Sequence, residues 1–342
     1  MHNELRSLLH ELTSIPGISG HEDQIARTLA AQLRLYSDEV TIDALGNVIA
    51  RQGSGTGRKI AICAHIDTVG LMIKRKITEG MFGITRIGGV NLKAMPGTRV
   101  IVGEQAGVIG VRSQHQAQAN DAAVTSDEDL HVLVAADAEI EITTPVHYAP
   151  QFTELSDNML VSPYLDNRAG CAVLLETARR LPESSPQTVY FIGTTQEETT
   201  CAGAMSVLQR VQPDACLFVD GTVSYDTPDT RGKGSVALGQ GPVLTSFLYV
   251  SGLNGWHADP LLRSYLKQVA IEAGIEYQQD AIHGLMSDSR VAGWLGLSSV
   301  IIGVPMRGKH SAAEVCNLND LEQAIKLLLA VLSTPLPTLQ RG

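Results

Sequence analysis

The sequence predicts an α/β protein with a mixed, largely parallel central sheet flanked by helices and interrupted by an inserted β-rich domain. Three observations support this fold class. Short apolar runs are typical of buried parallel strands, helical repeats alternate with them, and a central stretch changes to glycine-rich, alternating sequence. At 342 residues, the chain is long enough for one large domain and one smaller domain.

Leucines at helical spacing open the chain, and the segment 16–20, Pro-Gly-Ile-Ser-Gly, then breaks it before a second helical stretch at about 22–35. Asp259 followed by Pro260 is a typical helix start, with an N-cap residue before proline at the first helical position. Further helices are predicted at 168–181, from 259 to about 274, and at 318–332.

Four apolar runs are predicted to be buried parallel strands. They are Lys59–Ala64, Thr188–Gly193, Ala215–Val219 and Ser299–Val304. Each leads toward histidine or acidic residues. In open α/β sheets the ligand crevice lies at the carboxyl ends of the strands, so we expect these polar residues to gather there.

Between the first of these strands and residue 158 the composition and the residue pattern of the sequence change. Glycines are frequent, and short alternating runs such as Thr98–Val102 and Ala138–Ile142 are typical of strands. We therefore expect a β-rich insert over 69–158, which divides the larger domain into residues 1–68 and 159–342.

Composition narrows the class of protein. The formal net charge of −10 and the lack of a basic patch argue against nucleic-acid binding. We find no apolar run long enough for a membrane span, and the mixed-charge N-terminus does not resemble a secretory signal, so a cytoplasmic protein is expected. Five scattered cysteines, without a Cys-x-x-Cys pair, predict neither a disulfide framework nor a thiolate metal site.

Short motifs near the strand ends contain the candidate functional residues. These are His65, Asp67, Asp166, Glu197, Glu198, Asp220 and His310. Each has an ordinary structural explanation when taken alone. A lone histidine is more often hydrogen-bonded within the structure than bound to metal, and an aspartate before a helix is usually its cap. The adjacent glutamates are the exception, since two carboxylates at a buried strand end repel each other unless a cation compensates.

Taken together, the candidates favour a site for two metal ions. All are nitrogen or oxygen donors, which suits zinc, cobalt or manganese. If the two histidines and three of these carboxylates are the metal ligands, they can complete two metal sites only when one carboxylate is shared between the metals. One glutamate of the adjacent pair then remains free as a base, and Asp67 is placed to orient the His65 ring.

These motifs resemble, in order and spacing, the M42 family of metallopeptidases, of the glutamyl aminopeptidase and tetrahedral aminopeptidase type. The resemblance covers nearly the whole chain. It rests on the segments 16–20, 64–67 (Ala-His-Ile-Asp), 166–170 (Asp-Asn-Arg-Ala-Gly), 195–198 (Thr-Gln-Glu-Glu), Gly203-Ala204, Asp220 and 309–311 (Lys-His-Ser).

The resemblance implies an aminopeptidase that binds two zinc or cobalt ions and removes N-terminal residues from peptides. Asp166 would bridge the metals, with His65 and Asp220 completing one site and Glu198 and His310 the other. Glu197 would be the general base and Asp67 would assist. The larger domain would be catalytic, and the insert would form dimers able to assemble into a hollow dodecamer.

The chain departs from the family pattern at two places near this site. The family usually has glutamate at the position of Thr68, and an expected arginine is replaced by Ala202. Asp288, in a loop that resembles the family's Gly-Thr-Asp, could recognise a substrate ammonium or simply form a turn. Cys201, near the proposed metals, is expected to be a packing residue.

Other functions remain open on the sequence alone. The same dinuclear scaffold can serve a deacylase, because specificity lies in pockets that the motifs do not describe. A glycoside hydrolase that uses Glu197 or Glu198 as one of two acids is a further alternative, as is an inactive oligomeric binding protein.

Overall fold

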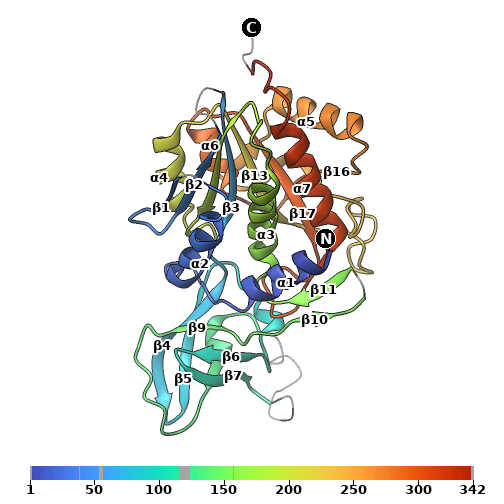
Figure 1. Ribbon diagram of the computed structural model, residues 1–342. Coiled ribbons are helices and arrows are strands. Elements are labelled where there is room, and N and C mark those ends of the chain that lie inside the picture. Colours follow the sequence, from blue (N-terminus) through green and yellow to red (C-terminus); the bar gives the residue numbers. More distant parts are fainter. Residues whose placement is uncertain are drawn as a thin grey trace.

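The computed structural model describes residues 2–37, 39–53, 57–113, 115, 124–156 and 158–339. It confirms the predicted fold class: a mixed, largely parallel sheet carries helices, and a closed β-barrel projects from it (Figure 1). Among the described residues, no helix is both long and apolar enough to cross a membrane.

The central sheet has the order β1-β2-β12-β3-β13-β17-β14-β15, with β16 paired to β14. Its middle strands β12, β3, β13 and β17 run parallel, as predicted, and the outer pairs β1–β2, β2–β12, β17–β14 and β14–β15 are antiparallel. The strands of this sheet are β1 (Glu39–Ile42), β2 (Val48–Gln52), β3 (Lys59–His65), β12 (Thr188–Thr194), β13 (Ala215–Val223), β14 (Val243–Ser251), β15 (Asn254–His257), β16 (Gln278–His283) and β17 (Ser299–Met306).

Helices cover both faces of this sheet. The long helix α3 packs on β3 and β13 and against α1, α2 and α7. Helices α4 and α6 pack on the other face of the sheet (Figure 1). Asp259 caps α5 as predicted, accepting hydrogen bonds from the backbone N–H groups of Leu261 and Leu262. The helices are α1 (His2–Thr13), α2 (Asp23–Leu33), α3 (Leu165–Arg180), α4 (Ala202–Val211), α5 (Pro260–Glu272), α6 (Ser289–Trp294) and α7 (Leu318–Leu332).

The barrel closes in the order β4-β5-β8-β7-β6-β9 around its own apolar core. Its strands are β4 (Gly70–Thr78), β5 (Met81–Ile87), β6 (Arg99–Val102), β7 (Gln105–Val111), β8 (Leu130–Leu133) and β9 (Pro145–Tyr148), with 3-10 turns η1 (Leu92–Ala94) and η3 (Asp127–Asp129). The predicted strand at Thr98–Val102 is present as β6. The expected strand at Ala138–Ile142 is wrong, because this segment forms turns despite its alternating pattern.

A small three-stranded sheet lies beside the barrel. It joins β10 (Thr153–Glu154), β11 (Met159–Ser162) and β18 (Glu314–Asn317) in antiparallel pairs. The strand β10, which falls inside the predicted insert, therefore pairs with β11, which lies outside it.

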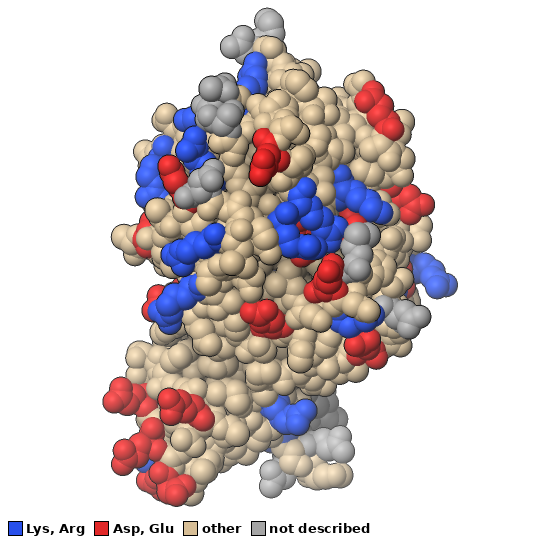
Figure 2. All heavy atoms as spheres, in the orientation of Figure 1, with Lys and Arg blue, Asp and Glu red and all other residues tan. Residues whose placement is uncertain are grey.

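Surface charge differs between the two parts of the molecule. On the face shown in Figure 2, acidic side chains gather at the end of the barrel, whereas charges of both signs mix over the part that contains the central sheet. The end of the barrel away from the central sheet is therefore acidic on this face.

Candidate metal centre

The candidate residues converge at the carboxyl edge of the parallel strands. His65 ends β3, Glu197 and Glu198 follow β12, and Asp166 begins α3. Asp220 lies within β13, which continues four residues beyond the predicted apolar run, and His310 lies in the turn between β17 and β18. Neighbouring parallel strands end side by side, which brings together residues that are up to 245 positions apart in the sequence.

Asp166 lies between the two histidines. Its Oδ1 is 3.5 Å from His65 Nε2, and its Oδ2 is 3.4 Å from His310 Nε2. Asp220 Oδ1 is 3.4 Å from His65 Nε2, and Glu198 Oε1 is 3.3 Å from His310 Nε2. We call His65 with Asp220 the inner half of the centre and His310 with Glu198 the outer half, because His65 is 3% exposed and His310 is 27% exposed.

Hydrogen bonds to the far side of each imidazole fix its orientation. His65 Nδ1 lies 3.1 Å from the carbonyl oxygen of Asp67, and His310 Nδ1 lies 2.9 Å from that of Gly89. A carbonyl can only accept, so Nδ1 carries the proton in each neutral ring. In a neutral ring the Nε2 lone pair then faces carboxylate oxygens, an arrangement that either a proton on Nε2 or a metal cation between them stabilises.

Two buried oxygens support the same conclusion. Asp166 Oδ1 and Glu198 Oε1 are shielded from solvent and have no hydrogen-bond partner among the described residues. Unpaired buried carboxylate oxygens are costly unless they bind a cation. Three groups of side chains lie close enough together to hold a metal: His65, Asp166 and Asp220; Asp166, Glu198 and His310; and His65, Glu197 and Glu198. The first two share Asp166. The residues present therefore fit two metal ions that share Asp166.

The titratable groups perturb one another strongly. Burial lowers the pKa of His65, but the carboxylates around it, first Glu197, outweigh this effect and raise the pKa well above its usual value. Burial raises the pKa of Glu197 well above the ordinary range, and Asp220 and Glu198 raise it further. Excess negative charge of this kind is what divalent cations neutralise.

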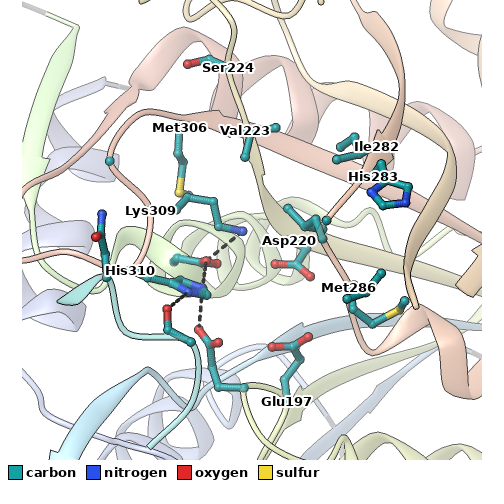
Figure 3. Close-up of a pocket in the computed structure, with 18 of the residues that line it drawn as sticks. Glu197, Asp220, Val223, Ser224, Ile282, His283, Met286, Met306, Lys309 and His310 are labelled. Carbon is teal, nitrogen blue, oxygen red and sulfur yellow. Dashed lines mark hydrogen bonds and ion pairs between the residues drawn. The ribbon is translucent and has the colours of Figure 1, made fainter. Parts of the chain in front are cut away.

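Lys309 brings a positive charge to the same place. Its Nζ is 2.9 Å from Asp166 Oδ2 and donates a 2.6 Å hydrogen bond to the carbonyl of Gly221 (Figure 3). Gly221 is close enough to Asp166 that a Cβ there would lie 2.7 Å from Oδ1. The Asp166 carboxylate is therefore held closely between β13 and the turn after β17.

Asp67 orients the glutamate pair more directly than it orients His65. Its carboxylate accepts hydrogen bonds from the backbone N–H groups of Glu197 at 2.9 Å and Glu198 at 3.0 Å, and a short one from the Ser19 hydroxyl. Its Oδ1 is 3.6 Å from His65 Nδ1, longer than the contact made by its own backbone carbonyl. Ser19 belongs to the segment 16–20, whose contact with the centre the sequence did not predict.

Glu314 is a second supporting residue that sequence reasoning missed. This buried side chain accepts hydrogen bonds from the backbone N–H of Asp166 at 2.8 Å and from that of His310 at 2.6 Å. Glu314 thereby links the backbone of Asp166 to the backbone of His310 in the outer half. Its position in β18, four residues after His310, was the only available signal, and that spacing is not distinctive.

The N-terminus of α3 shows whether Asp166 acts as the cap of this helix. Asn167, rather than Asp166, caps this helix: its Oδ1 accepts the N–H of Gly170 at 3.0 Å, and its Nδ2 donates to the carbonyl of Val219. Asp166 has non-helical backbone angles and makes no side-chain cap. Its carboxylate is therefore free to point into the centre.

The two departures from the family pattern have local explanations. Thr68 is fully buried, and its Oγ1 donates to the carbonyl of Gly17, so it holds the 16–20 turn. Ala202 begins α4, and close to it the guanidinium of Arg290 in α6 donates to the carbonyl of Thr200 at 3.3 Å.

Cys201 and Asp288 are both buried beneath the glutamate loop. Burial raises the pKa of the Cys201 thiol, which keeps it protonated and fits a packing role. Asp288 accepts a 2.6 Å hydrogen bond from Thr194 Oγ1, and burial raises its pKa to about 7. It is 3% exposed, so it is not placed to meet a substrate ammonium.

A large open cavity lies above the centre, with a volume of about 1000 Å³. His65, Asp166, Glu197, Glu198, Asp220 and His310 all line it. Binding sites for small molecules and peptides are commonly concave pockets of this kind. The centre is therefore accessible to a substrate of peptide size.

Comparisons with known proteins agree with this geometry. The family model described as M42 glutamyl aminopeptidase matches residues 46–327. A lysyl aminopeptidase of Pyrococcus furiosus is 30% identical, with 95% of this chain and 96% of that protein covered.

Solved structures give the same result. An aminopeptidase from the archaeon Desulfurococcus kamchatkensis superposes with a TM-score of 0.91 at 29% identity, covering 97% of this chain and 95% of that one. The TET1 peptidase of Pyrococcus horikoshii, described as able to assemble into a tetrahedron or a large octahedral shell, gives 0.85 at 27% identity, covering 96% and 99%.

Proposed function

The chain belongs to the M42 glutamyl aminopeptidase family and is a peptide-bond hydrolase, and from this premise we propose that it is a two-metal aminopeptidase that removes N-terminal residues from peptides. The observation that carries the proposal is the position of Asp166, whose two oxygens face two different histidines across the centre.

Two divalent ions, zinc or cobalt, would be held by the chain's nitrogen and oxygen ligands. His65 and Asp220 would hold one ion and Glu198 and His310 the other, with Asp166 shared between them. When bound, such ions acidify a water molecule and polarise the scissile carbonyl.

Glu197 would act as general base. Its carboxylate lies in the cavity wall with Oε2 3.9 Å from His65 Nε2, close to the proposed metals and outside the two ligand groups that share Asp166. It would take the proton from the attacking water and then deliver it to the leaving amine. Asp67 would hold the Glu197 backbone in place, which makes Asp67 a positioning residue.

We also propose that the protein works as a homo-oligomer. The similarity to a TET peptidase with closed assemblies supports dimers that combine into a larger shell. In this proposal the β-rich insert, residues 69–158, forms the dimer contact, and residues 1–68 and 159–342 form the catalytic domain.

Metal quantification with a substrate screen tests the proposal. We expect about two equivalents of metal per chain, hydrolysis of free-amine aminoacyl anilides, and loss of this activity in chelator with recovery when zinc or cobalt is added. N-acylated versions of the same substrates should remain intact.

The alternatives predict different results in the same screen. Preference for the N-acylated substrates would indicate a deacylase on this scaffold. Chelator-resistant hydrolysis of polysaccharide would indicate a glycoside hydrolase, and intact metal binding without hydrolysis of any peptide substrate would indicate a binding protein.

A further inference from the structure

The wall of the cavity beside the inner half is apolar. Val223 lies three residues after Asp220 on β13, and its register partner on the neighbouring strand β17 is Met306. Ile282, from β16, and Met286, from the loop before α6, continue this wall. Figure 3 shows Ile282 and Met286 on the side of Asp220 away from His310, with His283 beside Ile282, and Val223 between Asp220 and Met306.

This wall is packed firmly enough to have a fixed shape. Ile282 is 3% exposed and Met306 is 1% exposed, so both are set into the protein core, whereas Val223 and Met286 are half-buried and present surface to the cavity. Apolar surface that lines a pocket favours an apolar ligand, and a charged ligand group placed against it loses hydration.

Two of the cations that line the cavity are already engaged by carboxylates. Arg307 donates to both oxygens of Asp226, at 2.9 and 2.7 Å, and Lys309 is paired with Asp166. Neither charge is free to bind an acidic substrate side chain.

Arg290 is the strongest argument for an acidic substrate, since it donates to neutral oxygens, those of Asn254 and Thr200. Both of its terminal nitrogens are used in these bonds, and its guanidinium covers the ring of Trp294 at 5.3 Å. The Arg290 Nε is shielded from solvent, so it is not offered to a ligand in the cavity.

From these observations we infer that the site selects peptides with a neutral, apolar N-terminal side chain of leucine or methionine size, and that Val223 and Met286 determine this specificity. The inference rests on the proposed aminopeptidase function. The scissile carbonyl and free amine must lie at the metals and Glu197, so the first side chain reaches the nearest wall, which is formed by Val223, Ile282 and Met286.

The test uses the full-length, metal-loaded protein and the p-nitroanilides of leucine, methionine, alanine, glutamate and lysine. We expect kcat/KM for leucine and methionine to exceed that for alanine, glutamate and lysine by at least about tenfold, the scale on which an apolar pocket discriminates. Highest activity on lysine or glutamate, or equal rates on all five, would overturn the inference while leaving the proposed function intact.

Variants locate the specificity within the wall. Val223→Asp should lower kcat/KM for leucine by at least about tenfold and raise the ratio of lysine to leucine activity, because it places an unpaired carboxylate in the pocket. Val223→Thr is the matched control, since it keeps the shape of the side chain without a charge, and it should retain the preference for leucine. Met286→Glu provides a second test if Val223→Asp does not fold, and metal content is measured for each protein.

Arg290→Met tests the competing explanation, in which Arg290 selects an acidic substrate side chain. We expect its ranking of the five substrates to match that of the unmodified protein. If glutamate is the best substrate and this variant loses that preference, Arg290 determines specificity and the apolar assignment is wrong. If the metal-loaded, unmodified protein hydrolyses none of the anilides, the proposed function fails and this inference fails with it.

Discussion

The inner and outer halves of the candidate centre are built from different parts of the fold. His65 and Asp220 belong to adjacent parallel strands in the middle of the sheet, and both are almost completely buried. His310 and Glu198 come from turns, and His310 has a left-handed backbone with φ of 63°. The inner ligands are therefore positioned by strand pairing and the outer ligands by contacts between loops.

This difference makes the outer half depend on residues from elsewhere in the chain. Glu314 accepts the backbone N–H of His310, and the carbonyl of Gly89, in the segment between β5 and η1, accepts from its ring. A Cβ at Gly89 would lie 3.0 Å from His310 Nδ1, so this segment approaches the ligand closely. The β-rich insert thus contributes to the outer half, whereas the inner half lies within the central sheet.

The largest effect is expected from Glu197→Gln, which tests whether the proposed base Glu197 is also a metal ligand in the inner or the outer half. We expect kcat to fall by about a thousandfold, because general-base catalysis contributes roughly 10²–10⁴ in rate. Both metals should remain bound, as measured by elemental analysis. Selective loss of one metal would show that Glu197 is a ligand and that the division into two halves is wrong.

Glu314→Gln should weaken metal binding more in the outer half than in the inner half, because Glu314 contacts both the shared residue Asp166 and the outer residue His310. Glutamine keeps one accepting oxygen, so the backbone N–H of either Asp166 or His310 loses its partner. Removing a residue that orients a ligand typically lowers metal affinity by about 10–100-fold, measurable by competition with a chelator. Glu322→Gln, a buried glutamate paired with Arg180 away from the centre, is the control and should leave both affinities unchanged.

The unmodified protein should lose its metals in two steps. Because the outer ligands are more exposed and lie on turns, we expect one equivalent to leave at a chelator concentration about tenfold below that needed for the second, a difference within the range that supporting contacts can produce. Elemental analysis along a chelator titration measures this. Simultaneous loss of both equivalents would contradict the comparison.

The smallest effect concerns the base of the turn that carries His310. Arg307 lowers the pKa of Asp226 to about 2 through two hydrogen bonds. A depressed folded-state pKa stabilises the fold above the unfolded pKa near 4, and this contribution is lost as pH falls toward 2.

Asp226→Asn should therefore lower the free energy of unfolding by about 1 kcal/mol at pH 7, an amount reduced by partial solvent exposure of the pair. Urea unfolding at pH 7, 5 and 3 should show the difference between variant and unmodified protein shrinking at the lowest pH. Asp229→Asn, in the same loop, keeps an oxygen that can accept from the Thr227 hydroxyl and should have a smaller effect. A difference independent of pH would exclude the ion pair as its cause.

Much of the inner half could be predicted from the sequence. A buried parallel strand appears in the sequence as a continuous apolar run, and the first polar residue after the run indicates where the strand ends, as at His65. The family resemblance supplied the remaining ligand assignments, which stay proposals. The failed strand at Ala138–Ile142 shows the limit of the same reasoning, because alternation specifies a strand only where a partner strand pairs with it.

The sequence by itself determined the fold class, the parallel strands and the set of nitrogen and oxygen donors, because these depend on local periodicity and residue type. Only the tertiary structure decided that Asp166 faces two histidines, that Glu314, Lys309 and Gly89 support the outer half, and that the cavity wall is apolar. These features join residues far apart in the chain, and no local pattern records which distant backbone group or side chain will fill the space beside a given residue.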